Sequence, residues 1–233
     1  MDTQTRHALK QDKLITTTQT GLDWLQEHRE SAIRTSIVAV LVLAALIAGL
    51  VTYYHRSDAA ELAFGAAIDT YSAPLAQPGQ PATPGEKTFA TAALRAKAAN
   101  EQFNQIAERY GMLRPGRTAL YFAGVTALEM GQTGTAETDL QKVADSHDTN
   151  LAALAKLALA GLYQNTNRDS KAVVLYQQLI AKPTTTVPAN AARLQLAALY
   201  ETTNPAEAQR IYAQLKSDRG AAGQIAAQKL TQK

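Results

Sequence analysis

The sequence predicts an all-α protein in which a single N-terminal transmembrane helix is followed by an α-solenoid of stacked helix pairs. Two observations lead to this prediction: an uncharged apolar run of membrane length near the N-terminus, and small residues that recur at a regular spacing further along the chain. Strand-like alternation of β-branched residues is absent beyond residue 87. The 233 residues therefore divide into a tail (1–34), a transmembrane helix (35–54) and a helical domain (55–233).

The apolar run at 35–54 has the properties of a membrane-spanning helix. It contains no charged residue, and twenty residues rising ~1.5 Å each cover ~30 Å, the thickness of the hydrocarbon layer. Arg34 precedes it, and Tyr53 and Tyr54 follow it, as is typical of residues at the membrane interface. A buried core helix seldom stays uncharged for this length, and a cleaved signal peptide would have an unusually long charged region before the run. We expect an uncleaved anchor in contact with membrane lipid.

Positive charge on either side of the run predicts its orientation. Five Lys or Arg residues occur in the first 34 positions, whereas only Arg56 occurs in the 20 residues after Tyr54. The more positive flank stays in the cytoplasm. We therefore expect 1–34 to be a cytoplasmic tail and the helical domain to lie on the other side. Trp24 either anchors the tail at the membrane interface or lies on a solvated juxtamembrane helix.

The domain begins with a predicted helix at 59–71 and an insert at 73–85. Four of the eight prolines of the chain fall in this insert, which predicts a loop, interpreted as a linker. The helix at 59–71 is expected to pair with a second helix at 88–110 across the insert. First helices at 119–131, 155–163 and 192–200 then alternate with further second helices, and 219–230 is expected to cap the array. Helix-breaking residues are expected to separate these short helices: Gly111, Pro115, Gly116, Gly131, Gly134, Pro183, Pro188, Pro205 and Gly220.

Small residues mark an internal repeat. In the second helix of each pair, an alanine is followed four positions later by a large residue, and these alanines are spaced by 37, 36 and 36 residues: Ala99, Ala136, Ala172 and Ala208. A small residue lies 11 or 12 positions earlier in the first helix of the last three pairs: Gly124, Ala160 and Ala197. Small residues allow helices to cross closely, while large ones fill the space between neighbouring pairs. We predict that Gly124, Ala136, Ala160, Ala172, Ala197 and Ala208 pack the repeats together.

This pattern resembles the tetratricopeptide repeat. With Gly124 at the eighth position of that motif, Ala136 and Leu140 fall at the twentieth and twenty-fourth, where a small and a large residue are expected. The spacing of 36–37 residues is longer than the ideal ~34, so the prediction is a tetratricopeptide repeat-like array. An ordinary Ala-rich helical bundle is the alternative.

A concave groove is the usual binding surface of such an array. On the repeat numbering, its lining is mostly apolar, and the candidate residues are Tyr121, Val125, Leu128, Leu154, Leu157 and Leu194, with the polar Gln164 and Glu201 on the same face. An apolar, uncharged groove suits extended or unfolded polypeptides. Packing of the same residues against neighbouring helices is an equally good interpretation.

The sequence shows no catalytic, metal or cofactor site. Absence of cysteine excludes disulfides, thiolate ligands, cysteine nucleophiles and a lipid on an N-terminal cysteine. The histidines are isolated, and no phosphate-binding or nucleophile motif occurs: His7, His28, His55 and His147 lie in the tail, at the membrane edges and in a turn. The charge of +3 is scattered, which argues against nucleic acid as a partner. We do not expect an enzyme.

The layout as a whole resembles the YfgM-type bacterial inner-membrane proteins. The resemblance rests on the combination of a short tail, one anchor, a helix just outside the membrane and the repeat-like array. It implies a single-pass inner-membrane protein with a periplasmic domain, associated with the SecYEG translocon and with periplasmic chaperones. Two functions follow: a membrane-anchored adaptor or chaperone for unfolded or exported polypeptides, or a structural scaffold for a cell-envelope complex.

Overall fold

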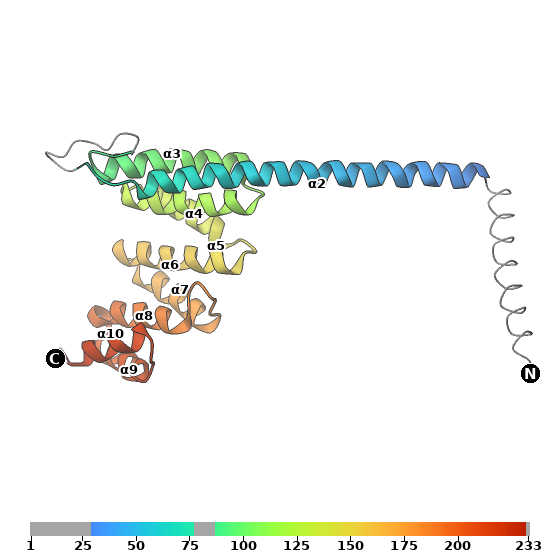
Figure 1. Cartoon of the computed structure of the whole chain (residues 1–233). Helices are drawn as coiled ribbons and strands as arrows, with labels where there is room; N and C mark the ends of the chain where they lie inside the picture. The colour runs from blue at the N-terminus through green and yellow to red at the C-terminus, as the bar shows by residue number, and fades with distance from the viewer. Residues whose placement is uncertain (1–28, 77–86, 232–233) are drawn as a thin grey trace, which may run out of the picture. The chain divides into compact units, whose positions relative to one another are not determined.

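The computed structural model describes residues 29–76 and 87–231, and all regular secondary structure in these residues is helical (Figure 1). An isolated bridge between Leu75 and Phe89 closes the base of the insert. The all-α prediction is confirmed. The helices of the described residues are α2 (Arg29–Ser72), α3 (Ala92–Tyr110), α4 (Arg114–Glu129), α5 (Thr133–Ala144), α6 (Thr149–Asn165), α7 (Asp169–Ala181), α8 (Ala189–Thr203), α9 (Pro205–Leu215) and α10 (Ala221–Thr231).

The chain forms two compact units, Met1–Arg56 and Ser57–Lys233. Most of the predicted tail, including Trp24, lies outside the described residues, as does 77–85 of the predicted insert.

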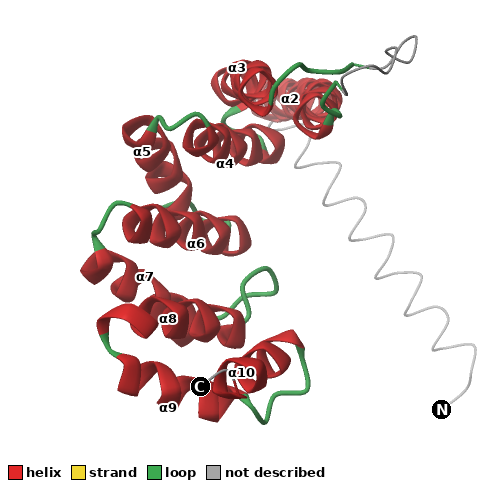
Figure 2. Ribbon diagram, turned by 90° about the vertical axis from the view of Figure 1, so that its left-hand side faces the viewer, coloured by secondary structure: helices red, strands yellow, loops and turns green. Residues whose placement is uncertain are grey.

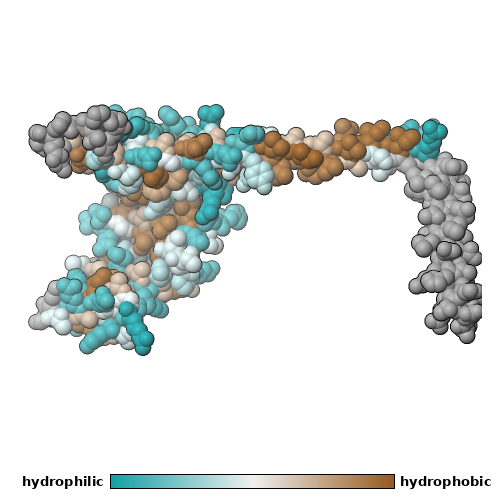
Figure 3. Space-filling view, in the orientation of Figure 1, coloured by the Kyte–Doolittle hydropathy of each residue, from teal (hydrophilic) through white to brown (hydrophobic). Residues whose placement is uncertain are grey.

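The first unit contains the predicted transmembrane segment. Its large apolar side chains are exposed, for example Leu41 at 63% and Leu46 at 65%, and they form a continuous apolar surface (Figure 3). In the described part of the chain, α2 is the one helix that is long and apolar enough to cross a membrane. A helix that exposes apolar side chains on every face is typical of a membrane span or of a helix covered by other protein.

Helix α2 does not end after the apolar run but continues to Ser72. The predicted helix at 59–71 is therefore the last part of α2 and not a separate element. No proline lies between Tyr54 and Ala59, so nothing in the local sequence removes a backbone donor or blocks the helix there.

In the second unit, each helix from α3 to α10 packs on the next one in the chain. First helices also meet across the intervening second helix, since α4 contacts α6, and α8 contacts α10. Figure 2 shows α4, α6 and α8 following one another in a stack. Contacts are thus made mainly between neighbours in sequence, which the short connections allow.

Several predicted helix breakers begin helices instead. Pro115 lies in the first turn of α4, and Pro205 is the first residue of α9. Proline is tolerated there because first-turn amide groups have no partner within the helix. Gly116 is also helical, and a Cβ at this position would collide with the carbonyl of Tyr110, so glycine permits a close approach and does not break the helix.

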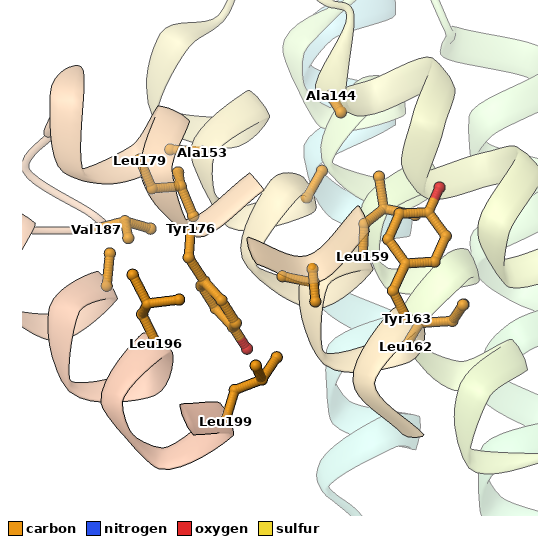
Figure 4. Packing of buried hydrophobic residues seen from close by; sticks show 14 of the residues in the cluster. Ala144, Ala153, Leu159, Leu162, Tyr163, Tyr176, Leu179, Val187, Leu196 and Leu199 are labelled. Carbon is orange, nitrogen blue, oxygen red and sulfur yellow. The ribbon is translucent and has the colours of Figure 1, made fainter. Parts of the chain in front are cut away.

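The six predicted packing residues are all buried: Gly124, Ala136, Ala160, Ala172, Ala197 and Ala208. A Cβ added at Gly124 would lie 2.7 Å from Cγ of Leu140, which brings α4 directly against α5. The surrounding core, which we call the alanine–leucine core, extends from α4 to α10 and is made largely of Ala and Leu with Tyr163 and Tyr176 (Figure 4).

A second core joins α2 to α3 and α4. Its centre, the aromatic cluster, consists of Phe64, Tyr71, Phe103 and Phe122. Phe103 is fully buried and stacks on Phe122 with ring centroids 5.2 Å apart, while Phe64 lies 5.9 Å from Phe103. Tyr71 donates a hydrogen bond of 2.6 Å to Glu129 Oε1. The repeat spacing does not predict this cluster.

Candidate protein-binding surfaces

The six groove candidates lie on first helices of the predicted pairs. Together they are named the apolar stripe: Tyr121, Val125 and Leu128 on α4, Leu154 and Leu157 on α6, and Leu194 on α8. Every one is partly buried, and all six pack against the alanine–leucine core. Because α4 contacts α6, the stripe residues of α4 and those of α6 lie on adjoining helices. The stripe is thus at the border of the core, with part of each side chain open to solvent.

Tyr121 connects the stripe to the aromatic cluster. Its ring meets Phe122 edge-on, with centroids 5.4 Å apart. Burial raises the pKa of the Tyr121 hydroxyl above its usual value of 10.0, so the group is neutral at physiological pH. A rigid aromatic side chain with a neutral polar tip is typical of residues that bind apolar segments.

The two polar residues on the same face are already hydrogen-bonded within the unit. Gln164 Oε1 accepts a bond of 3.4 Å from Tyr176, and Glu201 Oε1 accepts one of 2.7 Å from Tyr212. Burial, followed by the bond to Glu201, raises the pKa of Tyr212. Glu201 also pairs with Lys229 of α10 at 3.0 Å. These contacts hold first helices on their second helices and fasten α10.

An ion pair fixes α5 to the turn between α6 and α7. Arg168 Nη1 donates to both carboxylate oxygens of Glu137 at 2.8 and 3.0 Å, and its guanidinium lies 4.5 Å from the Tyr163 ring centroid. The hydrogen bond from Arg168 lowers the pKa of Glu137. Local sequence patterns do not predict this contact, because Glu137 and Arg168 are 31 residues apart.

Two open clefts of about 620 and 510 Å³ lie beside the turn between α7 and α8. Their linings share Thr149, Pro183 and Thr184, and no residue of the apolar stripe lines either cleft. The turn is positioned by Thr185, which donates to Asn150 Oδ1 at 2.9 Å. Both linings mix polar and apolar residues, and the hydrophobic pattern of the sequence does not signal them.

Isolated histidines remain isolated where the structure describes them. His55 and His147 are exposed, whereas His7 and His28 lie outside the described residues. No group of three or more His, Asp or Glu that could hold a metal ion occurs in the described residues. Asp148, in the acidic turn next to His147, accepts a bond of 3.1 Å from the Leu151 amide and so caps α6.

No protein-family model, curated protein or solved structure matches the chain. Its class is therefore defined by architecture: an all-helical protein with one helix long and apolar enough to span a membrane.

Proposed function

We propose that the protein is a membrane-anchored interaction module that binds unfolded or exported polypeptides along the apolar stripe. The observation that carries this proposal is the stripe itself, six partly exposed apolar residues on the first helices of successive pairs. Contiguous apolar surface that is only partly covered is typical of sites for extended hydrophobic segments. Attachment to α2 would keep such a surface close to chains that emerge from a membrane.

The proposal includes a tetratricopeptide repeat-like α-solenoid. Small residues are buried at 36–37-residue intervals, and each helix packs on the next. The turns add an independent sign of repetition, since Gly131 (φ 73°) and Asn167 (φ 56°) both adopt the left-handed conformation and are 36 residues apart. Left-handed residues at equivalent turns indicate equivalent helix pairs.

Single-pass insertion in a bacterial inner membrane, with a cytoplasmic N-terminus and a periplasmic repeat unit, is part of the same proposal. A fusion of alkaline phosphatase after residue 60 should be active, and a cytoplasmic reporter at the same place should be silent, because the more positive flank stays inside. The opposite pattern would contradict the orientation. SecYEG subunits and periplasmic chaperones are the partners expected from the resemblance to YfgM-type proteins.

Site-specific photo-crosslinking tests the binding surface. Crosslinkers at Tyr121, Leu157 and Leu194 should capture unfolded polypeptides, whereas crosslinkers at the exposed Lys142 and Gln177 on second helices should not. Capture should persist at high salt, because burial of apolar area and not ion pairing supplies the affinity. Equal capture at all five positions, or none at the stripe, would contradict the proposed site.

The second candidate function, a scaffold for a folded envelope protein, is favoured by the position of the clefts. Both lie beside the α7–α8 turn and away from the stripe. A crosslinker at the exposed Thr185 should then capture one folded partner, and an excess of unfolded polypeptide should not compete with that capture. Capture at Thr185 without capture at Leu157 would favour the scaffold.

A further inference from the structure

The turn between α3 and α4 presents an unusually exposed apolar side chain. Met112 is 94% exposed, the highest value among the large apolar residues of the described part of the chain. The turn is nevertheless well held: the Leu113 amide donates to the Tyr110 carbonyl at 2.8 Å, and Arg117 Nη1 donates to the Met112 carbonyl at 2.7 Å. Met112 is therefore displayed by a fixed backbone.

This turn lies at the same end of the second unit as Ser57, the first residue of that unit. Arg95 donates to the Ala73 carbonyl at 3.1 Å, and Phe103 lies against Phe64, so α3 runs antiparallel to the last part of α2. Seven residues of helix, about 10 Å, separate Phe103 from Tyr110 and likewise Phe64 from Ser57. The α3–α4 turn is thus level with Ser57, in agreement with the shared core that contains Ala60 and Tyr110.

Ser57 follows Tyr54, the last residue of the predicted transmembrane segment, by only three positions. Three residues span at most about 11 Å even when fully extended. Covalent connectivity alone therefore keeps this end of the unit near the membrane surface, whatever the angle between the two units.

The charge of the turn suits lipid phosphates. Residues 108–117 contain Arg109, Arg114 and Arg117 and one acidic residue, Glu108. Arg114 is 83% exposed and makes only a long contact of 4.0 Å with Asp148. The exposed acidic residues at the start of the unit, Asp58 and Glu61, oppose this charge in part. Arginine binds phosphate oxygens through a planar fork of donors.

We propose that the α3–α4 turn docks on the bilayer that α2 spans, with Met112 inserted at the boundary of headgroups and acyl chains and the three arginines on lipid phosphates. This inference rests on the proposed membrane anchor. One methionine and three arginines bind a free membrane weakly, but tethering through a short connection gives an effective concentration on the order of millimolar. Weak contacts of this kind are then well populated.

Depth-dependent fluorescence quenching tests this contact in the full-length chain. The single tryptophan is removed as Trp24→Phe, and Met112→Trp is introduced as the probe. The protein is reconstituted into vesicles of phosphatidylcholine with one part in three phosphatidylglycerol, carrying brominated acyl chains. Matched probes are Val174→Trp on α7, which is 52% exposed, and Leu43→Trp within the anchor.

Quenching of the Met112→Trp probe should be several-fold stronger than that of Val174→Trp. It should fall when Arg114, which does not hold the turn, is replaced by glutamine and when phosphatidylglycerol is omitted. Quenching of Leu43→Trp together with equal quenching of the Met112 and Val174 probes would overturn the inference and leave the anchor intact. Absence of quenching in Leu43→Trp would overturn the anchor itself.

A second labelling scheme protects the test against a misfolded tryptophan variant. The chain has no cysteine, so Met112→Cys can be spin-labelled selectively. The label should be more accessible to oxygen than to a water-soluble nickel chelate, as expected at a membrane boundary. Equal accessibility to the nickel chelate at Met112→Cys and Val174→Cys would contradict docking.

Discussion

The aromatic cluster and the alanine–leucine core fill the second unit in different ways. The aromatic cluster joins α2, α3 and α4 through a few large rings, with Phe103 fully buried at its centre. The alanine–leucine core is instead made largely of Ala and Leu and contains the repeat alanines Ala136, Ala172 and Ala208. A repeated crossing can be extended pair by pair, because each pair contacts only its neighbours. A ring cluster has no such period and suits the single junction at the start of the array.

Removing the centre of the aromatic cluster should lower the stability of the protein more than any other change proposed for the two cores. Phe103→Ala deletes a fully buried ring and should cost ~3–5 kcal/mol. Because coupling decays along a stack of neighbours, hydrogen exchange should accelerate in α3 and α4 and much less in α8 and α9. Phe89→Ala, a change outside the cluster, is the control. Uniform loss of protection across all helices would show that the two cores are one cooperative unit.

Overpacking a repeat crossing should destabilise the protein less than Phe103→Ala does, and it should affect the alanine–leucine core. Ala172→Leu forces a larger side chain into a fully buried site and should cost ~1–3 kcal/mol, measured by urea unfolding. Ala213→Leu, on the exposed face of α9, should change stability little. A neutral Ala172→Leu variant would argue that α6 and α7 do not cross where the repeat pattern places them.

The smallest expected effect concerns the ion pair between Glu137 and Arg168. Both side chains are about one third exposed, at 31% and 33%, so Glu137→Gln should cost only ~0.2–1 kcal/mol at pH 7. Arg168 lowers the pKa of Glu137 below its ordinary value of 4.5, so this stabilisation is present above about pH 4.5 and is lost as pH falls through the folded-state pKa. Unfolding curves of the variant and the wild type should therefore converge as the pH falls through the folded-state pKa of Glu137. A difference that persists in acid would assign the effect to packing over Tyr163.

Local sequence rules predicted most elements but misjudged several boundaries. Proline was expected to separate helices, whereas Pro115 and Pro205 lie in first turns, where the missing amide costs nothing. The last helix pair is one residue shorter, and Asn204, in place of a left-handed turn residue, has φ −153° and caps α9 by accepting from the Glu207 amide. A spacing pattern detects the missing residue but not how the turn closes without it.

Helical periodicity and charge by themselves determined that this chain is helical, that residues 35–54 form an apolar span, and that small residues recur where helices cross. These properties depend on residues within a few helical turns. Tertiary structure alone decided that Phe64, Phe103 and Phe122 meet, that Met112 is displayed beside the start of the unit, and that the apolar stripe is half-buried. An apolar helix face has the same spacing whether it is covered or open, so only the packing of distant segments determines how much of it solvent can reach.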